Sequence, residues 1–296
     1  MDKLYSPLKM AQLRDKYDFR HSKSLGQNFL SDKNIIDRII EGSGVGKEDL
    51  VIEIGPGMGV LTAAAAECAA HVTAVEIDRH LIPILAETLK DYDNVNILHG
   101  DIMKTDLKEV IQQQRSRGLT GKVRIIGNLP YYITTPIVMK LLEEEIPADS
   151  ITVMMQKEVA DRIQASPGSK RYGALTVAVG FYCTVSHIAN APKEVFVPRP
   201  KVDSTVIRLD LRGEQPVNLV DRKLFFETVK NGFGQRRKTL LNALTGIRGL
   251  KKEEISSVLQ AAGIDPVRRA ETLSMEEFAA VANEVAAKVQ HAEEGY

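Results

Sequence analysis

The sequence predicts an α/β protein with a doubly wound sheet, mostly parallel with an antiparallel edge strand, and a small C-terminal all-α domain. Three observations indicate this fold. Short β-branched apolar runs alternate with helical segments through most of the 296 residues. A glycine-rich turn follows the first strong run, at residues 55–59. Beyond residue 216 the apolar positions keep helical spacing only.

Each expected strand is a short apolar run bounded by glycine or by polar turn residues. Because helical segments separate all of the first five runs except the third and the fourth, the sheet should be mainly parallel. The last two runs are expected to form an antiparallel edge pair. The expected strands are residues 50–54, 71–75, 95–98, 123–127, 151–155, 185–189 and 204–211.

Helices are expected where apolar residues recur at intervals of three and four positions. Ser31 or Asp32 is placed to cap the helix that contains Ile35 and Ile40. The expected helices cover residues 9–17, 35–40, 63–70, 79–89, 136–145, 157–165, 173–182, 222–233, 236–244, 252–262 and 274–289.

The composition changes at two places and suggests three segments. Residues 1–22 form a polar N-terminal extension, and residues 23–212 hold the alternating strands and helices. The turn-forming stretch at 213–216 then introduces a helical domain at 213–296.

No apolar run is long enough to span a bilayer, and the first residues lack the apolar centre of a signal peptide. Cys68 and Cys183 stand alone, with no spacing that suggests a disulfide framework or a metal site. We therefore expect a cytoplasmic protein with no membrane partner and no metal.

The net charge is zero, but the charges are unevenly distributed. Residues 199–252 contain 13 Lys and Arg against 5 Asp and Glu, which favours a polyanionic partner such as RNA. The cations expected to contact RNA are Arg199, Lys201, Arg222, Lys223, Arg236, Arg237 and Lys238.

Arg236, Arg237 and Lys238 stand at the start of the helix expected at 236–244. Cations there oppose the helix dipole, so a role beyond helix stability is indicated. Backbone N–H groups at a helix start also bind anions, which favours phosphate contact. The alternative is an ordinary solvated charged face.

Four consecutive strands are followed by groups suited to a nucleoside cofactor, at the sheet edge where such ligands bind. Gly55 lets the backbone approach a ligand closely, and Glu76, about twenty residues on, can accept ribose hydroxyls. Asp101 can accept an adenine amine, and Asn128 follows the fourth strand. Taken singly, each has a structural alternative: tight helix packing, a helix cap or a turn.

The turn Asn128-Leu129-Pro130-Tyr131 presents one amide and one aromatic ring at a strand end. The Asn128 oxygen and a neighbouring carbonyl can accept both N–H bonds of an exocyclic amine, and Tyr131 can stack on its ring. Pro130 ends the strand and stiffens the turn. The alternative is an ordinary strand exit.

A proline-rich segment, residues 192–204, is expected to be an extended loop that cannot join a sheet. It carries Phe196, which looks exposed and is flanked by cations. Phe196 is either an exposed ring available to a ligand or an anchor packed into the core.

Six motifs together resemble the rRNA adenine N6-dimethyltransferases, most closely the bacterial small-subunit (16S) enzymes of the KsgA/RsmA family. The resemblance runs from about residue 23 to the end of the chain. The motifs are Ser24-Leu25-Gly26-Gln27-Asn28-Phe29-Leu30, Glu53-Ile54-Gly55-Pro56-Gly57-Met58-Gly59, Val75-Glu76-Ile77-Asp78, Gly100-Asp101-Ile102, Gly127-Asn128-Leu129-Pro130-Tyr131-Tyr132-Ile133 and Pro200-Lys201-Val202-Asp203-Ser204.

The resemblance implies that the doubly wound sheet is a Rossmann-like methyltransferase sheet, with S-adenosyl-L-methionine as methyl donor. It implies a product of two adjacent N6,N6-dimethyladenosines in the hairpin near the 3′ end of 16S rRNA, made on the assembling 30S subunit. We expect the enzyme to be monomeric. The expected cofactor contacts are Asn28, Leu30, Gly55, Gly57, Glu76, Ile77, Asp101, Ile102 and Asn128.

The residues expected to act on the target base are Asn128, Leu129, Pro130, Tyr131 and Phe196. Three other functions remain open on the residues alone. They are a large-subunit rRNA adenine dimethylase, a non-catalytic RNA-binding assembly factor, and a nicotinamide-dependent oxidoreductase. The Leu-Pro-Tyr-Tyr sequence, the Pro-Lys-Val-Asp-Ser loop and the long C-terminal region favour the small-subunit enzyme.

Overall fold

A computed structural model describes residues 4–22 and 25–294. The chain forms two compact units, residues 1–160 with 184–211, and residues 161–183 with 212–296. This division differs from the predicted domains in two places. The N-terminal extension belongs to the first unit, and residues 161–183 belong to the helical one.

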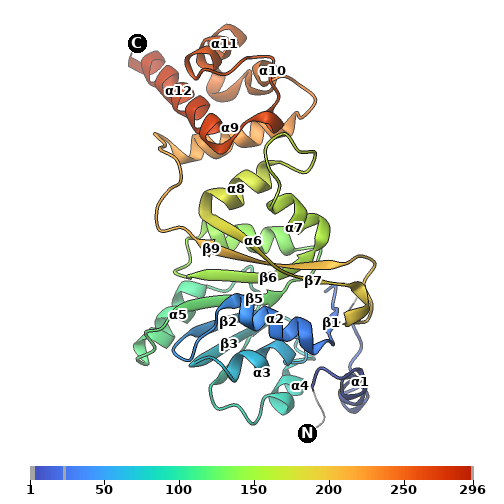
Figure 1. The fold of residues 1–296 in the computed structure, drawn as a ribbon. Helices are drawn as coiled ribbons and strands as arrows, with labels where there is room; N and C mark the ends of the chain where they lie inside the picture. The colour runs from blue at the N-terminus through green and yellow to red at the C-terminus, as the bar shows by residue number, and fades with distance from the viewer. Residues whose placement is uncertain (1–3, 23–24, 295–296) are drawn as a thin grey trace. The chain divides into compact units, whose positions relative to one another are not determined.

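The first unit contains a seven-stranded sheet in the order β4-β3-β2-β5-β6-β9-β7 (Figure 1). Strands β2 to β6 pair in parallel, and β9 runs antiparallel beside β6. The predicted α/β fold is therefore confirmed. The strands are β2 (Leu50–Ile54), β3 (His71–Glu76), β4 (Val95–His99), β5 (Val123–Asn128), β6 (Ser150–Gln156), β7 (Cys183–Ala191) and β9 (Ser204–Leu211).

Helices α2 and α3 cover one face of this sheet (Figure 1). Their apolar residues, such as Ile36 and Leu61, form one cluster with Val51, Val72 and Ile126 of the strands. The Asp32 side chain caps α2 by accepting from the Ile35 N–H, as predicted. The helices of this part of the chain are α1 (Pro7–Lys16), α2 (Lys33–Ser43), α3 (Val60–Ala66), α4 (Ile82–Thr88), α5 (Leu107–Ser116), α6 (Thr134–Glu143) and α7 (Lys157–Ile163).

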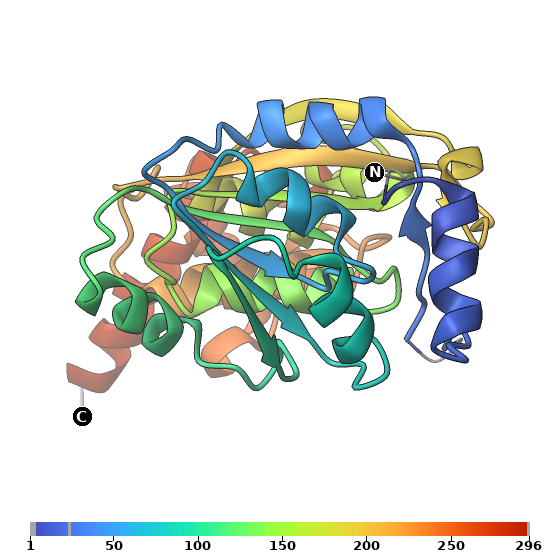
Figure 2. The ribbon, with the colours of Figure 1, turned by 90° about the horizontal axis from the view of Figure 1, so that it is seen from below.

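Helix α1 packs against the strand-end region of the first unit and is not a separate extension. Its Met10 and Leu13 are buried in a cluster with Phe29 and Met58. Figure 2 shows α1 beside β1 (Phe29–Leu30). The Lys16 ammonium and the Tyr17 hydroxyl, just beyond α1, bind the Glu87 carboxylate on α4. The N-terminal segment is therefore part of the scaffold around the glycine turn.

The proline-rich segment does join a sheet, so the prediction that it cannot is wrong. Phe196–Val197 forms β8, which pairs antiparallel with β1 through Leu30 opposite Phe196 and Phe29 opposite Val197. The three prolines leave this two-residue strand free to pair because they lie outside it. A 3₁₀ turn, η1 (Lys193–Val195), precedes β8.

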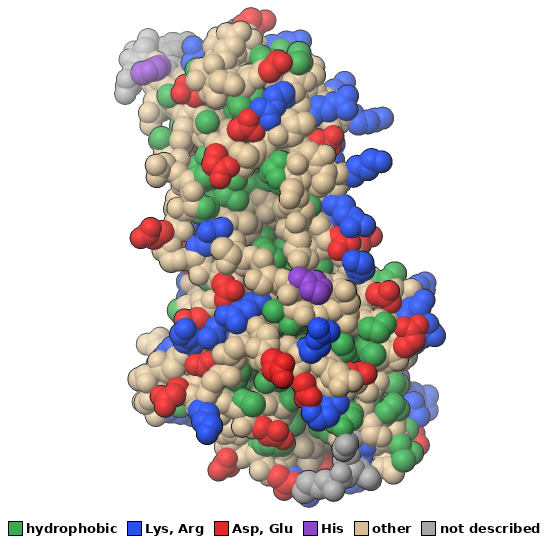
Figure 3. Space-filling model, in the orientation of Figure 1, with side chains coloured by type: hydrophobic (Ala, Val, Ile, Leu, Met, Phe, Trp, Pro, Cys, Tyr) green, Lys and Arg blue, Asp and Glu red, His purple; other side chains and the backbone are tan. Residues whose placement is uncertain are grey.

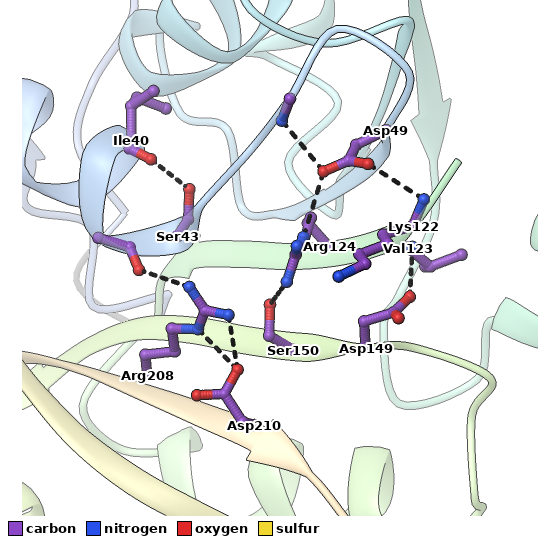
Figure 4. A network of polar contacts seen from close by, with 12 residues as sticks. Ile40, Ser43, Asp49, Lys122, Val123, Arg124, Asp149, Ser150, Arg208 and Asp210 are labelled. Atoms are coloured by element: carbon purple, nitrogen blue, oxygen red, sulfur yellow. Dashed lines mark hydrogen bonds and ion pairs between the residues drawn. The ribbon is translucent and has the colours of Figure 1, made fainter.

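A buried ion pair holds the starts of the central strands (Figure 4). Arg124 of β5 donates from Nε to Asp49 at 3.2 Å and from Nη1 to the Ser150 hydroxyl of β6 at 3.0 Å. Asp49 also accepts the backbone N–H groups of Gly46 and Lys122. The network lies at the amino ends of the strands, away from the candidate site.

The second unit is helical and has its own core, in which Phe225, Phe278 and Leu240 are fully buried. Its elements are α8 (Ala174–Tyr182), α9 (Arg222–Gly234), α10 (Leu240–Leu244), η2 (Ile247–Gly249), α11 (Lys252–Ala261), η3 (Ala270–Thr272) and α12 (Met275–Glu294). Within the described residues, no helix has both the length and the hydropathy that a membrane crossing requires.

Candidate active site

The carboxyl ends of β2 to β5 surround a pocket with about 880 Å³ of empty space, part of which is open to solvent. This is the edge at which the sequence predicts a ligand. The pocket brings together most of the predicted site residues. They are Asn28, Gly55, Gly57, Glu76, Ile77, Asp101, Ile102, Asn128, Leu129, Pro130 and Tyr131.

The glycine turn after β2 forms one wall of the pocket. Gly55 has φ of 70° and Gly57 has φ of 60°, a left-handed conformation that glycine adopts without strain. A Cβ on Gly57 would lie 2.7 Å from the Phe29 ring, so a side chain there would displace that ring. The turn therefore requires glycine both for its backbone shape and for its close packing.

Glu76 ends β3 and is 4% exposed. Its Oε1 accepts the Asp78 N–H at 2.8 Å, and its Oε2 accepts the Gly57 N–H at 3.3 Å. Burial raises the pKa of Glu76 to about 7, against the opposing effect of these hydrogen bonds. Each oxygen can still accept a further bond, so the carboxylate suits a pair of ribose hydroxyls.

Asp101 and two isoleucines provide a place for a flat ring. The Asp101 Oδ1 accepts the Met103 N–H at 2.9 Å, so this carboxylate also forms the turn that its sequence suggested as the alternative. Ile77 is 48% exposed although it is large and apolar, and Ile102 is 8% exposed. Both line the pocket, where an adenine would cover them.

Asn128 is held by the loop that contains Asn28. The Asn128 Nδ2 donates to the backbone carbonyl of Asn28 at 2.8 Å. Since the amide nitrogen is used in this way, the Oδ1 is left as the acceptor that Asn128 can offer to a substrate. The side chain thus has the orientation that recognition of an amine requires.

Two adjacent tyrosines follow Pro130. Tyr131 lies in the pocket wall, and its hydroxyl is 2.7 Å from the Ser204 hydroxyl. Tyr132 also lines the pocket and is 59% exposed, with its ring close to Gly26. Tyr132 is not among the residues predicted to act on the base, although the adjacent pair Tyr131-Tyr132 is a signal for both rings.

Leu30 and Phe196 lie in the core and do not line the pocket. Phe196 is 3% exposed, so of the two alternatives that the sequence leaves open, the anchor packed into the core is confirmed and the exposed ring is wrong. Both side chains pack in the cluster beneath α2, because the pairing of β1 with β8 turns them toward it. Phe29 lines the pocket in their place.

Several of the predicted RNA-binding cations have protein partners. Arg199 binds the Glu194 carboxylate. The Arg222 guanidinium donates to the Tyr182 hydroxyl at 2.7 Å and lies over the Tyr182 ring. Arg236 binds Glu271 and also donates to the carbonyls of Lys170 and Tyr172. A surface arginine such as Arg199 can exchange its carboxylate partner for an RNA phosphate. Arg222 and Arg236, in contrast, each hold several groups of the helical unit and have structural roles there.

The cations at 236–238 are not at a helix start, so that prediction is wrong. Helix α9 ends at Gly234, and α10 begins only at Leu240, so the three cations lie in the turn between them. Arg237 and Lys238 are exposed there, as are Lys201 and Lys223 elsewhere. Figure 3 shows Lys and Arg side chains along the margin of the helical unit where α10 lies.

Comparison with known proteins agrees with this geometry. Residues 18–287 match the family model described as ribosomal RNA adenine dimethylase. Ribosomal RNA small subunit methyltransferase A of Clostridioides difficile is 51% identical over 98% of this chain and 99% of its own. The Bacillus licheniformis protein of that name is 50% identical over 94% of this chain and 96% of its own.

Solved structures show the same fold. A dimethyladenosine transferase from Plasmodium falciparum has a TM-score of 0.75 and 25% identity, covering 88% of this chain and 98% of its own. The 23S rRNA methyltransferase ErmE has a TM-score of 0.65 and 24% identity, covering 87% of this chain and 99% of its own. With its Rossmann-like sheet, its glycine turn and its strand-end carboxylates, this chain belongs to the ribosomal RNA adenine dimethylase family of S-adenosylmethionine-dependent enzymes.

Proposed function

We propose that this enzyme dimethylates N6 of two adjacent adenosines in the hairpin near the 3′ end of 16S rRNA. It acts on the assembling 30S subunit, in the cytoplasm and as a monomer. The observation that carries the proposal is the orientation of the Asn128 amide, whose nitrogen donates to the Asn28 carbonyl at 2.8 Å in a pocket that Tyr131 also lines.

The pocket residues fit S-adenosylmethionine. Glu76 would accept the ribose hydroxyls, Asp101 the adenine amine, and Gly55 and Gly57 leave room for the backbone to approach. Leu30 would contribute through its backbone, because its side chain is in the core. The bound cofactor supplies a methyl group on a sulfonium, which is already activated for transfer.

The protein's task at the target base is to orient a weak nucleophile. The lone pair of an adenine amine is delocalised into its ring. If the Asn128 Oδ1 and the Leu129 carbonyl accept its two N–H bonds, the nitrogen becomes more tetrahedral and its developing positive charge is stabilised. Pro130 fixes the turn that sets these two acceptors side by side.

The target adenine must leave its stack to reach this pocket. Stacking on Tyr131 would return roughly 1–3 kcal/mol of that cost. Phe196 would have to leave its buried cluster to reach the base, so we assign the stacking to Tyr131.

The small-subunit assignment is supported by the relatives named above. The Clostridioides difficile and Bacillus licheniformis proteins, about half identical to this chain over nearly its whole length, both carry the small-subunit name. The exposed Lys201, Lys223, Arg237 and Lys238 are proposed to contact RNA phosphates.

Asn128→Ala tests the proposed role of the amide. We expect methyl transfer to under-methylated 30S subunits to be lost, while S-adenosylhomocysteine binding weakens by less than about tenfold, since one hydrogen bond contributes about 1 kcal/mol. Asn96→Ala, an exposed position on β4, is the matched control. Wild-type transfer by Asn128→Ala would refute the role.

Primer extension on both rRNAs from a deletion strain decides between the small and large subunits.

A further inference from the structure

The loop that contains Asn28, residues 25–28, is tied to the end of β3 by one side-chain hydrogen bond. The Gln27 Nε2 donates to the Asp78 Oδ2 at 2.7 Å. The Gln27 Oε1 accepts the Ser22 N–H at 2.8 Å, which fixes which end of the amide faces Asp78. Gln27 lines the pocket, so the bond lies at the wall of the cofactor site.

Asp78 is built to receive this bond. It is 6% exposed, and its Oδ1 accepts the backbone N–H of His80 at 3.0 Å and lies 2.9 Å from the His80 Nδ1. Burial raises the pKa of Asp78, but the hydrogen bonds from Gln27 and His80 outweigh that effect and hold it below its ordinary value. An ionised acceptor makes the hydrogen bond from Gln27 a strong one.

Asp78 is also connected to the cofactor side of the pocket. Its own backbone N–H donates to the Glu76 Oε1 at 2.8 Å. On the other side of the loop, the Asn28 carbonyl accepts from Asn128. The loop is thus fastened at two points, to the end of β3 through Gln27 and to the end of β5 through Asn28.

We propose that Asp78 is a positioning residue that, through Gln27, holds the loop at residues 25–28 over the bound cofactor. The inference rests on the use of this pocket for S-adenosylmethionine. Its consequence is that loss of the bond loosens the loop in the free protein and speeds release of the cofactor. Because Asn28 belongs to this loop, loss of the bond also frees the Asn128 amide from the Asn28 carbonyl.

The polarity of the bond allows a rescue experiment. Gln27→Glu places two carboxylates against each other, while the introduced carboxylate still accepts from Ser22. In Asp78→Asn the introduced amide oxygen is still needed by the His80 N–H. The introduced amide nitrogen then faces the Gln27 amide nitrogen, and two donors meet without an acceptor between them. In the double variant the introduced amide nitrogen donates to the introduced carboxylate, so the bond forms again with its polarity reversed.

The experiment measures S-adenosylhomocysteine binding by calorimetry at pH 8, its dissociation rate, and amide hydrogen exchange of residues 25–30 in the cofactor-free protein. We expect each single variant to bind at least about tenfold more weakly and to exchange faster in this segment, since a hydrogen bond to a charged group is lost. The double variant should recover most of the binding affinity and most of the protection from exchange. Gln113→Glu is the control, because Gln113 donates to the Glu109 carboxylate on the exposed face of α5.

Melting temperatures of all variants separate a loosened loop from a destabilised fold. The proposal is overturned if Gln27→Glu behaves like Gln113→Glu, or if the double variant is as impaired as the sum of the single ones. Methyl transfer by the wild-type enzyme tests the proposed function separately, so a failure of either idea can be told from a failure of the other.

Discussion

The hydroxyl groups of Tyr131 and Ser204 lie 2.7 Å apart and join the end of β5 to the first residue of β9. Ser204 is fully buried, and burial raises the pKa of Tyr131, so its hydroxyl stays protonated at working pH. The contact fixes the plane of the ring that is proposed to stack on the target base. This contact explains why the Pro-Lys-Val-Asp-Ser motif ends in a serine.

Ser204→Ala should reduce kcat about tenfold and leave S-adenosylhomocysteine affinity unchanged. The ring loses its fixed orientation, whereas the cofactor contacts lie elsewhere in the pocket. Tyr131→Phe removes the same bond from the other side, so the double variant should be no worse than either single one. Single-turnover assays on under-methylated subunits would measure this, and an additive double variant would contradict it.

Cofactor affinity should fall as the pH is lowered through about 7, because burial raises the pKa of Glu76 to about 7. Below that pH the free protein carries a protonated Glu76, and ribose hydroxyls donate more strongly to a carboxylate than to the neutral acid. Binding must then release a proton. Calorimetry with S-adenosylhomocysteine at pH 6, 7 and 8 measures the effect. Glu76→Gln should bind weakly with a flatter pH profile.

Glu53→Gln should stabilise the protein at alkaline pH. Burial raises the pKa of Glu53 to about 8, only partly offset by the Thr62 hydroxyl. The folded state therefore keeps a proton that the unfolded chain releases above about pH 4.5. The free energy of unfolding consequently falls as the pH rises from there to about 8.

Glutamine stays neutral and escapes this penalty. We expect Glu53→Gln to exceed wild type by roughly 4 kcal/mol in free energy of unfolding at pH 8, with the difference vanishing near pH 4. Denaturant titrations across this range measure it, with the exposed Glu48→Gln as control. A pH-independent difference would show that Glu53 is already ionised in the folded protein.

Breaking the buried ion pair at the other end of the sheet should destabilise the first unit strongly. Asp49→Ala leaves the Arg124 guanidinium, whose side chain is 8% exposed, without its carboxylate, at a cost of about 3–5 kcal/mol. Asp37→Ala removes the exposed partner of Lys33 and should cost less than about 1 kcal/mol. Urea unfolding compares the two. Similar losses would contradict a special role for the buried pair.

The turn between α9 and α10 should contribute to RNA binding through Arg237 and Lys238. Replacing both with Ala should lower the slope of log K against log salt by about 1 to 2. Arg236→Ala should instead lower the free energy of unfolding, because Arg236 holds Glu271 and two carbonyls. Filter binding at several salt concentrations and thermal melts separate these outcomes; equal salt slopes for the double variant and wild type would refute the contact.

The sheet and the four strand-end residues could be predicted because parallel strands present their carboxyl ends at one edge. Gly55, Glu76, Asp101 and Asn128 indeed line one pocket. The family motifs led to the same residues and to the correct family. These features follow from local sequence motifs together with the general rule that βαβ crossovers are right-handed, so no contact between distant residues has to be known.

The remaining features depend on contacts between distant parts of the chain. Strands β1 and β8 have two residues each and no periodicity, so their pairing, and with it the burial of Phe196, left no local signal. Helix α5 was missed because its sequence is mostly polar. The assignment of residues 161–183 to the helical unit depends on packing partners such as Phe225, which the spacing of α8 does not reveal.

The pairing of β1 with β8 has a consequence for biosynthesis. A nascent chain that has not yet exposed residues 196–197 lacks the partner strand for Phe29 and Leu30, and until residue 204 emerges it also lacks the hydroxyl that holds Tyr131. The pairing of β1 and the fixed orientation of Tyr131 therefore both depend on translation of the later strands. Truncated products released early from the ribosome would carry the family's N-terminal motifs yet remain inert.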